Sequence, residues 1–564
     1  MRKTLVFGTF LASWLLLACS SDENSNGSGG ASANAGTAGS SGAGGVSGAS
    51  GTGGSSGSSG TGGTGATGGT AGSAGAGGVA GNAGTGGTGA TGGTAGSAGT
   101  GGTGGTGGTG GTSGSGGTAG STPSGTWTST WAQSYGDSNV QRVDRVSMNA
   151  TGSLAIAVSY RGTVTIGGST LDDTNTEGPA WAIAVFDALG QPKFARRLAN
   201  TSFAGVTSID LGDDDTLLVS GWFTQSLNLG GAPLTTTLSQ DGFVARYSAT
   251  GDLLWNHSFG SQSTANATAF VAGAAYTQNE VWVVGNASEK VLLGTTLDLT
   301  AGGPPGLFAA RYGLDGTLVQ NGAKVFPEAH GIPYAMTARP NGGVVVAGQF
   351  LGSFSFGPST FNSQPGTDIQ DFADGYVALI DANFSPTWAS RIQQTSKSWL
   401  PNAVAVTPNG TTWVAGTTSY ATPTDTYDLD AAVAVIDAAG VEQWNQRFSY
   451  YASAQQALGI TTEADGHAVV VGVFAEAMGL PGGGTLSNAG SDDGFILRIS
   501  PDFQVTQALT VGDASAQQLS CVDSTTGGML AIGGQSSGNI VLSGMTLASG
   551  LVDDALLLVG KLSE

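Results

Sequence analysis

Short runs of alternating apolar and polar residues fill the chain from about Ser124 to Glu564. They are broken by Gly, Asn-Gly and Asp-Gly, and alternation of this kind predicts β-strands joined by tight turns. No apolar stripe of helical spacing is sustained along this stretch. The stretch also repeats itself. In each copy two apolar strands form a hairpin, and the second strand ends at Val158, Gly221, Gly285, Gly348, Gly416, Gly472 or Gly534.

A third and a fourth strand follow each hairpin. The third begins with an aspartate in five copies (Asp241, Asp374, Asp430, Asp493 and Asp554), which Ala180 and Gly306 replace in the other two. The fourth begins near Trp131, Phe194, Trp255, Gln320, Trp388, Trp444 or Gln507. Each repeat therefore has four strands, called A to D in chain order.

The two ends of this region complement each other. The first strand, around Trp127 to Tyr135, is a D strand without a preceding A, B or C, and the last repeat stops after its C strand. A chain that begins with the strand missing from its last repeat predicts a closed ring. We therefore expect an all-β fold, a seven-bladed β-propeller of four-stranded blades closed by an N-terminal strand, over residues 124–564. Stacked β-sandwich modules are the alternative, and they need no such permuted ends.

The N-terminus has the pattern of an export signal. Arg2 and Lys3 precede an apolar run to Leu17, which is too short to span a bilayer comfortably. Leu16-Leu17-Ala18-Cys19 resembles the bacterial lipobox, and this resemblance implies cleavage after residue 18 and acylation of Cys19, palmitate included. Ser20 is not the aspartate that marks inner-membrane retention in that family, so an outer-membrane lipoprotein is expected, at the cell surface or the periplasmic face. An ordinary secretory signal is the alternative.

The composition of residues 19–123 predicts a tether. From Ser21 to Gly120 there are 44 glycines in 100 residues, and Ser, Thr and Ala make up nearly all the rest. Such a segment cannot bury enough apolar surface to offset its backbone entropy, so we expect a disordered linker. Its root-mean-square reach would be roughly 50–60 Å.

Composition excludes several functions. The net charge of −21 and a charged fraction of 10% make nucleic-acid binding improbable, because phosphates repel an acidic surface. Two cysteines and three histidines exclude a disulfide framework and a histidine-rich metal cluster. Beyond the lipid anchor we expect a monomer with a protein or glycan ligand and no cofactor other than Ca²⁺.

One repeat copy carries a recognisable motif set. The copy from Thr216 to Trp255 has Gly221, Gly230-Gly231, Leu234, Asp241-Gly-Phe-Val-Ala245, Gly251 and Trp255. It resembles the SBBP-type β-propeller repeat of bacterial surface proteins, and the fifth copy departs from the pattern by lacking the Gly-Gly hairpin. The resemblance implies a fold and an extracytoplasmic setting. It implies no reaction.

Carboxylates gather in the B–C connections. Asp368, Asp371 and Asp374 lie in the fourth copy, and Asp425, Asp428 and Asp430 in the fifth. Asp492-Asp493 and Asp553-Asp554 stand at the same edge of the next two copies. Oxygen ligands at this density are suited to Ca²⁺, although neither cluster has the spacing of a calcium loop. The alternative is that the aspartate opening strand C caps its turn and that the others are solvated.

Other candidate residues are few. Trp399, Tyr450 and Tyr451 do not follow the repeat, which makes them candidates for a ligand-stacking surface. His257, His330 and His467 fall at unrelated repeat positions, and Cys521 is expected to be packed. The Gly-x-Ser-x-Gly match at 534–538 lacks the strand-to-helix elbow of a serine nucleophile, so no catalytic residue is assigned.

These observations favour a non-catalytic binding module and leave two alternatives. One is an extracytoplasmic hydrolase or lyase with its active site in the propeller funnel, and the other is a calcium-dependent adhesin. Carboxylates converging on the axis would favour the enzyme, whereas small apolar and hydroxyl side chains there would favour binding.

Overall fold

The computed structural model describes residues 123–173, 177–236, 240–260, 268–288, 290–293, 295–298, 306–364, 373–395, 397–421, 427–449, 453–550 and 552–563. All regular elements in these ranges are β-strands. The predicted signal, Cys19 and nearly all of the predicted linker lie outside the described residues.

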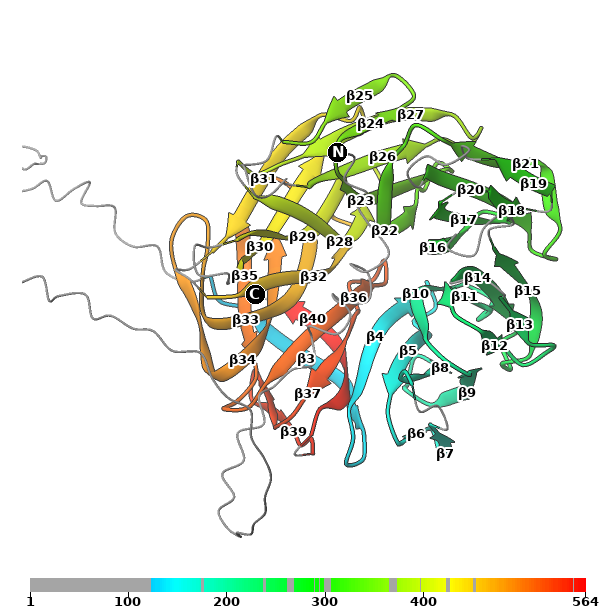
Figure 1. Cartoon of the computed structure of the whole chain (residues 1–564). Helices are drawn as coiled ribbons and strands as arrows, with labels where there is room; N and C mark the ends of the chain where they lie inside the picture. Colours follow the sequence, from blue (N-terminus) through cyan, green and yellow to red (C-terminus); the bar gives the residue numbers. More distant parts are fainter. Residues whose placement is uncertain are drawn as a thin grey trace, which may run out of the picture. The chain divides into compact units, whose positions relative to one another are not determined.

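Seven antiparallel sheets follow one another around a ring, each with the strand order A–B–C–D from the inside outwards (Figure 1). The sheets of the first three blades are β4 (Gln141–Met148), β5 (Leu154–Tyr160), β8 (Ala180–Phe186) and β9 (Pro192–Asn200); β10 (Ala204–Leu211), β11 (Leu217–Phe223), β14 (Asp241–Tyr247) and β15 (Leu253–Phe259); and β16 (Ala269–Thr277), β17 (Glu280–Ala287), β20 (Gly306–Gly313) and β21 (Leu318–Phe326).

The other four blades have the same order. They are β22 (Gly331–Ala338), β23 (Val344–Phe350), β26 (Asp374–Ile380) and β27 (Pro386–Ile392); β28 (Ser398–Val406), β29 (Thr412–Ala421), β30 (Tyr427–Ile436) and β31 (Glu442–Phe448); β32 (Gln455–Thr462), β33 (Ala468–Gly479), β34 (Thr485–Ile499) and β35 (Val505–Val511); and β36 (Gln517–Ser524), β37 (Leu530–Ser536), β40 (Asp554–Ser563) and β3 (Thr126–Tyr135).

The seventh blade joins the two ends of the propeller. Its outermost strand, β3, pairs antiparallel with β40 from Thr126↔Ser563 to Tyr135↔Ala555. Its innermost strand, β36, lies beside β4 of the first blade, so the ring of A strands is continuous. The predicted closure by the segment around Trp131 is therefore confirmed, and with it the seven-bladed propeller (Figure 1).

A β-bulge recurs in every A strand, where one residue has no partner on strand B. The bulged residues are Asp144, Thr207, Ala272, Tyr334, Asn402, Leu458 and Ser520.

The glycine expected to end strand B lies opposite this bulge in six blades, and strand B continues at least two residues beyond it. A Cβ on Gly472 would stand 1.9 Å from the Gln456 carbonyl oxygen, and a Cβ on Gly534 1.9 Å from that of Gln518. The glycine recurs because in these six blades the A strand leaves no room for a side chain there; the first blade has Val158 instead.

Aromatic side chains join the outer parts of neighbouring blades. The ring at the start of strand D packs on the C–D turn of the next blade, as Trp131 does on Gly190 and Trp255 on Gly316. The Trp255 indole N–H also donates to the Leu314 carbonyl at 3.0 Å. The recurrent tryptophans are thus packing residues, as their repetition predicts.

Most B–C connections form small hairpins, and apolar side chains of these hairpins are buried between the blades. The hairpins are β6 (Thr163–Ile166) with β7 (Ser169–Asp172), β12 (Ser226–Asn228) with β13 (Leu234–Thr235), β18 (Lys290–Leu293) with β19 (Thr295–Asp298), β24 (Ser353–Phe356) with β25 (Ser359–Asn362), and β38 (Ile540–Leu542) with β39 (Met545–Leu547). Side chains such as Val164, Phe354 and Ile540 are fully buried there. In the fifth and sixth blades strands B and C instead continue as one long ribbon, β29 with β30 and β33 with β34.

The close contact opposite the bulge predicts that a side chain at Gly534 destabilises the fold. Gly534→Ala would force its new Cβ against the Gln518 carbonyl oxygen, so we expect a loss of about 2–3 kcal/mol in the free energy of unfolding. Gly527→Ala is the control in the same blade, because its Cβ would meet only Thr525 Oγ1, at 3.6 Å. Urea unfolding of both variants provides the measurement. Equal stability of the two would contradict this account of the glycine.

Candidate functional site

The two faces of the propeller differ in their connections. Strands A to D alternate in direction, so the A–B and C–D turns share one face and the B–C and D–A connections share the other. The turns are short and alike, with the same backbone bond in Gly152 N–H to Asn149 O and Gly466 N–H to Glu463 O. The other connections vary from blade to blade. We call the two faces the turn face and the loop face.

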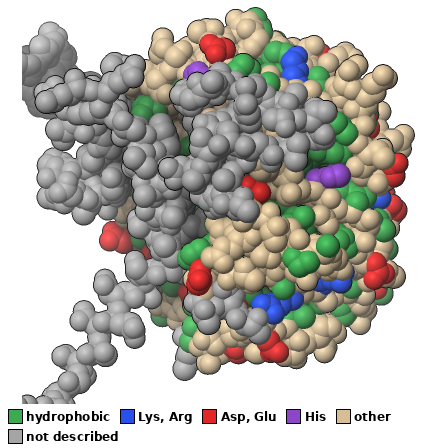
Figure 2. Space-filling model, turned by 45° about the vertical axis from the view of Figure 1, so that its right-hand side comes forward, with side chains coloured by type: hydrophobic (Ala, Val, Ile, Leu, Met, Phe, Trp, Pro, Cys, Tyr) green, Lys and Arg blue, Asp and Glu red, His purple; other side chains and the backbone are tan. Residues whose placement is uncertain are grey.

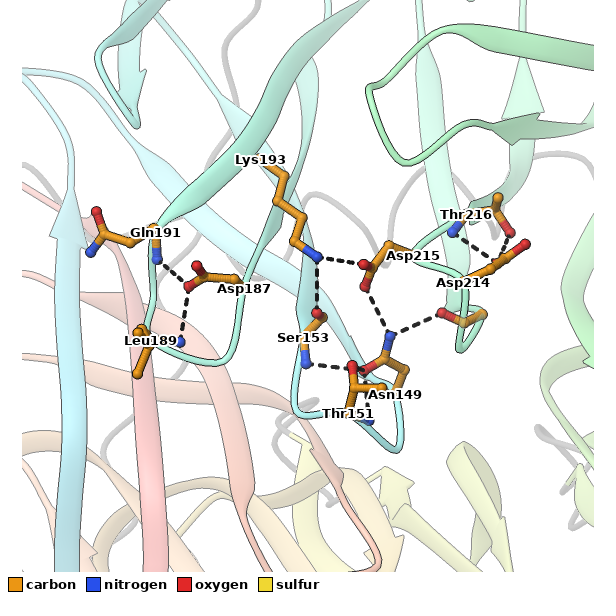
Figure 3. A network of polar contacts seen from close by, with 11 residues as sticks. Asn149, Thr151, Ser153, Asp187, Leu189, Gln191, Lys193, Asp214, Asp215 and Thr216 are labelled. Carbon is orange, nitrogen blue, oxygen red and sulfur yellow. Dashed lines mark hydrogen bonds and ion pairs between the residues drawn. The ribbon is translucent and has the colours of Figure 1, made fainter.

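Polar side chains on the turn face join the first two blades (Figure 3). Lys193 forms an ion pair with Asp215 and donates to Ser153 Oγ at 3.3 Å. Asn149 Nδ2 donates to Asp215 Oδ1 at 3.0 Å, and Asp214 accepts from the backbone and hydroxyl of Thr216. Asp214 and Asp215 are thus held within and beside their own turn.

The predicted calcium ligands are described only in part. Asp368, Asp371 and Asp425 lie outside the described residues, and Asp428 is described in its backbone alone. Asp374, the first residue of β26, and Asp430, the fourth residue of β30, are both buried. No group of three or more His, Cys, Asp or Glu side chains arranged for a metal ion occurs among the described residues. The calcium site in these two loops therefore stays a prediction.

Asp374 and Asp430 are held by cations of their own blades. Arg391 Nε donates to Asp374 Oδ2 at 2.7 Å, and Gln364 donates to both oxygens of that carboxylate. Arg447 and Lys397 approach Asp430 Oδ2 at 2.5 and 3.1 Å. Removing one partner of such a pair would leave a buried charge unpaired, which destabilises a fold strongly.

Asp493 and Asp554 cap their own B–C connections. Asp493 accepts the Ala489 N–H at 2.6 Å, and Asp554 accepts the Gly550 N–H at 2.6 Å. Burial raises the pKa of Asp493 to about 6, and the nearby carboxylate of Asp513 contributes. The alternative in which the opening aspartate caps its turn is confirmed for these two blades.

Trp399 requires a correction. Its side chain is fully buried, so it presents no ring face to a ligand. Strand C of the fifth blade has Ala432 opposite Gly416, where other blades have Phe243 or Tyr376, and the Trp399 ring fills that space against Gly416. The missing aromatic in this strand was the signal for a packing role. Tyr450 and Tyr451 lie outside the described residues.

Two carboxylates in the inner ring were missed by sequence reasoning. Asp210 lies on β10 and Asp523 on β36, at the same position of their A strands near the turn face. Asp210 Oδ2 accepts the Tyr276 N–H and Asp523 Oδ2 the Met148 N–H, both at 2.7 Å, in each case from the next blade. These bonds satisfy the open inner edge of the A strands. The only sequence signal for these two residues was their position after the bulge. That position recurs in every copy and lies near the axis.

The charged forms of the two inner carboxylates are destabilised by their surroundings. Burial raises the pKa of Asp210 to about 7, and the charge of Asp523 adds to the increase. Burial likewise raises the pKa of Asp523 to about 6. The same ring position in other blades carries Ser147, Ala275, Thr337, Ala405 and Thr461. Carboxylates with raised pKa therefore stand beside small and hydroxyl side chains.

The bulges add polar bonds between A strands. Arg145 Nε donates to the Thr207 carbonyl at 2.7 Å, Thr207 Oγ1 to that of Val271 at 2.8 Å, and Asn402 Nδ2 to that of Ala457 at 2.8 Å. These side chains tie successive inner strands together, so their polar groups are already occupied.

The remaining candidates are structural. Ser536, the serine of the Gly-x-Ser-x-Gly match, is buried and donates to the Gly538 carbonyl at 2.8 Å. Burial raises the pKa of the Cys521 thiol to about 12, as expected of a packed cysteine. His257 stacks on Tyr312 and contacts the Gly316 carbonyl through Nε2 at 2.9 Å. Within the described ranges, no helix is long and apolar enough to cross a membrane.

Comparisons with known proteins add no activity. No protein-family model and no curated protein matches the chain. Similar solved structures include a protein of unknown function from Dyadobacter fermentans (9% identity, 78% of this chain and 99% of that chain, TM-score 0.38). Others are the GH93 α-L-arabinofuranosidase of Fusarium graminearum (12%, 75% and 97%, 0.35) and a PL25 ulvan lyase (8%, 73% and 91%, 0.39). Similarity at this level carries no argument about function, and the fold rests on the strand pairings themselves.

The inner carboxylates predict a pH dependence. Because the pKa of Asp210 in the folded protein, about 7, exceeds its ordinary 3.8, its contribution to stability is fully present below about pH 4 and is lost as the pH rises through 7. Asp210→Asn keeps an oxygen that accepts the Tyr276 N–H and removes the charge. We expect this variant to be more stable than the wild type at pH 8, by about 1–2 kcal/mol after allowance for solvent along the axis, and equally stable near pH 4.

Urea unfolding at several pH values measures this effect. Asp252→Asn, at an exposed carboxylate, serves as the control and should follow the wild-type profile. Identical profiles for wild type and Asp210→Asn would show that Asp210 carries no such strain.

Proposed function

We propose that this chain is an outer-membrane lipoprotein whose propeller presents the loop face to a protein or carbohydrate ligand, without catalysis. The observation that carries the proposal is the asymmetry between the two faces. The turn face repeats nearly the same short turns, whereas the B–C connections of the loop face include five hairpins and two extended ribbons. Variation of loops on a rigid repeated scaffold is typical of binding surfaces.

The surface chemistry is compatible with a neutral ligand. Acidic and basic side chains are scattered among uncharged atoms in the view of Figure 2. The aspartates that open strand C are buried and serve their own blades. Two large hydrophobic side chains, Phe203 in a D–A connection and Val541 on a B–C hairpin, are exposed by 45% and 44% on the loop face. Aromatic side chains are frequent anchors in interfaces.

The N-terminal sequence supports the membrane attachment. The lipobox-like Leu16-Leu17-Ala18-Cys19 and the glycine-rich segment after it would hold the propeller on a spacer of roughly 50–60 Å root-mean-square reach. Several acyl chains on one cysteine anchor stably, because each buried methylene contributes about 0.8 kcal/mol. The resemblance of the repeat to the SBBP type agrees with an extracytoplasmic location.

The anchor is tested by Cys19→Ser. We expect this variant to leave the outer-membrane fraction and to become soluble after export, because the acceptor of the lipid is lost. Fractionation of cells that express wild type or variant measures the change, and Cys521→Ser is the matched control that should remain in the membrane. A Cys19→Ser protein that still fractionates with membranes would contradict the lipid anchor.

The binding face is tested by exposed residues of both faces. In a glycan and surface-protein binding screen with the soluble Cys19→Ser chain, Phe203→Ala and Val541→Ser should weaken binding to the identified ligand by about tenfold each. Leu189→Ser and Val441→Ser alter side chains on the turn face that are exposed by 78% and 55%, and these variants should bind as the unmodified protein does. Weakened binding only in the turn-face variants would refute the assignment of the loop face.

The inner carboxylates favour a second candidate, a hydrolase or lyase acting on an extracellular polymer. Raised pKa values in an enclosed site are a common feature of acid–base catalysis. Cleavage of a polysaccharide that is lost in both Asp210→Asn and Asp523→Asn would support the enzyme. If the protein binds a polymer without cleaving it, and both variants still bind, the result supports the non-catalytic module.

A further inference from the structure

The aspartate that opens strand C has a different environment in different blades. In the fourth and fifth blades it faces an arginine from strand D, Arg391 for Asp374 and Arg447 for Asp430. Each arginine lies opposite the second residue after the aspartate, Tyr376 and Ala432 respectively. A guanidinium from the protein therefore neutralises each of these two buried carboxylates.

The second, sixth and seventh blades have the aspartate but not the arginine. In the second blade Ser258 lies opposite Phe243, and Asp241 Oδ1 is buried without a hydrogen-bond partner. The equivalent position of strand D is Thr510, opposite Phe495, in the sixth blade and Ser134, opposite Leu556, in the seventh. Asp493 and Asp554 are only 0% and 7% exposed, and the Oδ1 atom of each is buried without a hydrogen-bond partner. A buried carboxylate oxygen in this state is costly unless a cation, a hydrogen-bond donor or a proton reaches it.

A glycine lets a second oxygen approach Asp493. A Cβ on Gly512 would stand 2.3 Å from Asp493 Oδ1 and 2.3 Å from Gln517 Oε1, so both oxygens pack against the glycine where a side chain would not fit. We call this group (Asp493, Gly512 and Gln517) the Asp493 cradle. It joins β34 of the sixth blade to β36 of the seventh.

The same arrangement recurs on the other side of the seventh blade. A Cβ on Gly136 would stand 2.0 Å from Asp554 Oδ1 and 2.8 Å from Gln141 Oε1. This group (Asp554, Gly136 and Gln141) is the Asp554 cradle, and it joins β40 to β4 of the first blade. The sequence around both is alike, Gly136-Asp-Ser-Asn-Val-Gln141 and Gly512-Asp-Ala-Ser-Ala-Gln517.

The glutamine amides are fixed with oxygen towards the carboxylate. Gln517 Nε2 donates to Asp513 Oδ1 at 2.9 Å, and its Oε1 accepts the Asp513 N–H at 3.1 Å. Gln141 Nε2 donates to Asp137 Oδ1 at 2.8 Å. Reversing either amide would break these bonds. Two acceptors therefore face each other in each cradle, and a cation between them satisfies both.

We propose that the Asp493 and Asp554 cradles each bind one calcium ion, which neutralises the carboxylate as Arg391 and Arg447 do in the fourth and fifth blades. Carboxylate and amide oxygens are hard ligands of the kind that Ca²⁺ prefers, and water completes its six to eight ligands. With a single carboxylate in direct contact, each site is weak, in the range of about 0.1–1 mM that is typical of extracellular modules. The two ions would hold both sides of the blade that closes the ring.

Calorimetric titration of the purified full chain with CaCl₂ at pH 7.5 tests the proposal, with Cys19→Ser included to keep the protein soluble. We expect about two ions per chain and a melting temperature several degrees higher in 5 mM CaCl₂ than in EDTA, because a ligand that binds only the folded state stabilises it. Asp493→Asn and Asp554→Asn should each reduce the stoichiometry to about one. Ionic-strength-matched NaCl should give no comparable shift.

Two further variants separate a binding role from a folding defect. Thr510→Arg places a guanidinium at the position of Arg391, so it should raise the melting temperature in EDTA and reduce the stoichiometry to one. Asp374→Asn breaks the ion pair with Arg391, so it should lower the melting temperature at every calcium concentration and still bind two ions.

Three outcomes would overturn the proposal. The first is the absence of calcium binding by the wild type at pH 7.5. The second is binding that Asp374→Asn removes and that Asp493→Asn and Asp554→Asn leave intact, which would place the ion in the B–C loops of the fourth and fifth blades. The third is stabilisation of the wild type on acidification below pH 6 without any effect of CaCl₂, which would show that a proton alone satisfies Asp493.

Discussion

The antiparallel pairing of β3 with β40 is the contact on which the rest of the structure depends. It joins residues at opposite ends of the propeller, and Trp127 N–H donates to Ser543 Oγ across 416 positions of sequence. Closing a loop of this length costs only about 5 kcal/mol in chain entropy, since the cost grows with the logarithm of length. In return the ring leaves neither a first nor a last blade with an uncovered face, and every A strand gains two neighbours.

Two sets of contacts then fix how each blade sits on the next. Near the axis, bulged A strands exchange hydrogen bonds, as Thr207 does with Val271, and the carboxylates of Asp210 and Asp523 satisfy the open inner edge. At the periphery an aromatic ring locks onto the next C–D turn, as Trp131 does on Gly190. Most of the polar side chains that sequence analysis would treat as candidates for binding or catalysis are used in these contacts. The loop face is left as the part of the surface that varies without disturbing the ring.

The buried aspartates show how a repeat can keep a residue and change its partner. Asp374 and Asp430 are matched by arginines of the same blade, whereas Asp493 and Asp554 face an amide oxygen across a glycine. Asp493 and Asp554 flank the seventh blade, which is assembled from both ends of the propeller. A cation supplied from outside would therefore act where the ring is joined.

Periodicity alone determined the strand order, the number of blades and the closure, because each repeat carries the same turn residues and the same small strand-ending position. It also identified the recurrent tryptophans as packing residues. Sequence reasoning missed the burial of Trp399, although the missing aromatic at Ala432 of β30 was a signal for it. Nor could it place Asp210 and Asp523 beside the axis or Gln517 opposite Asp493. Those contacts join residues of different blades, so only the rotation from one blade to the next decides which side chains meet.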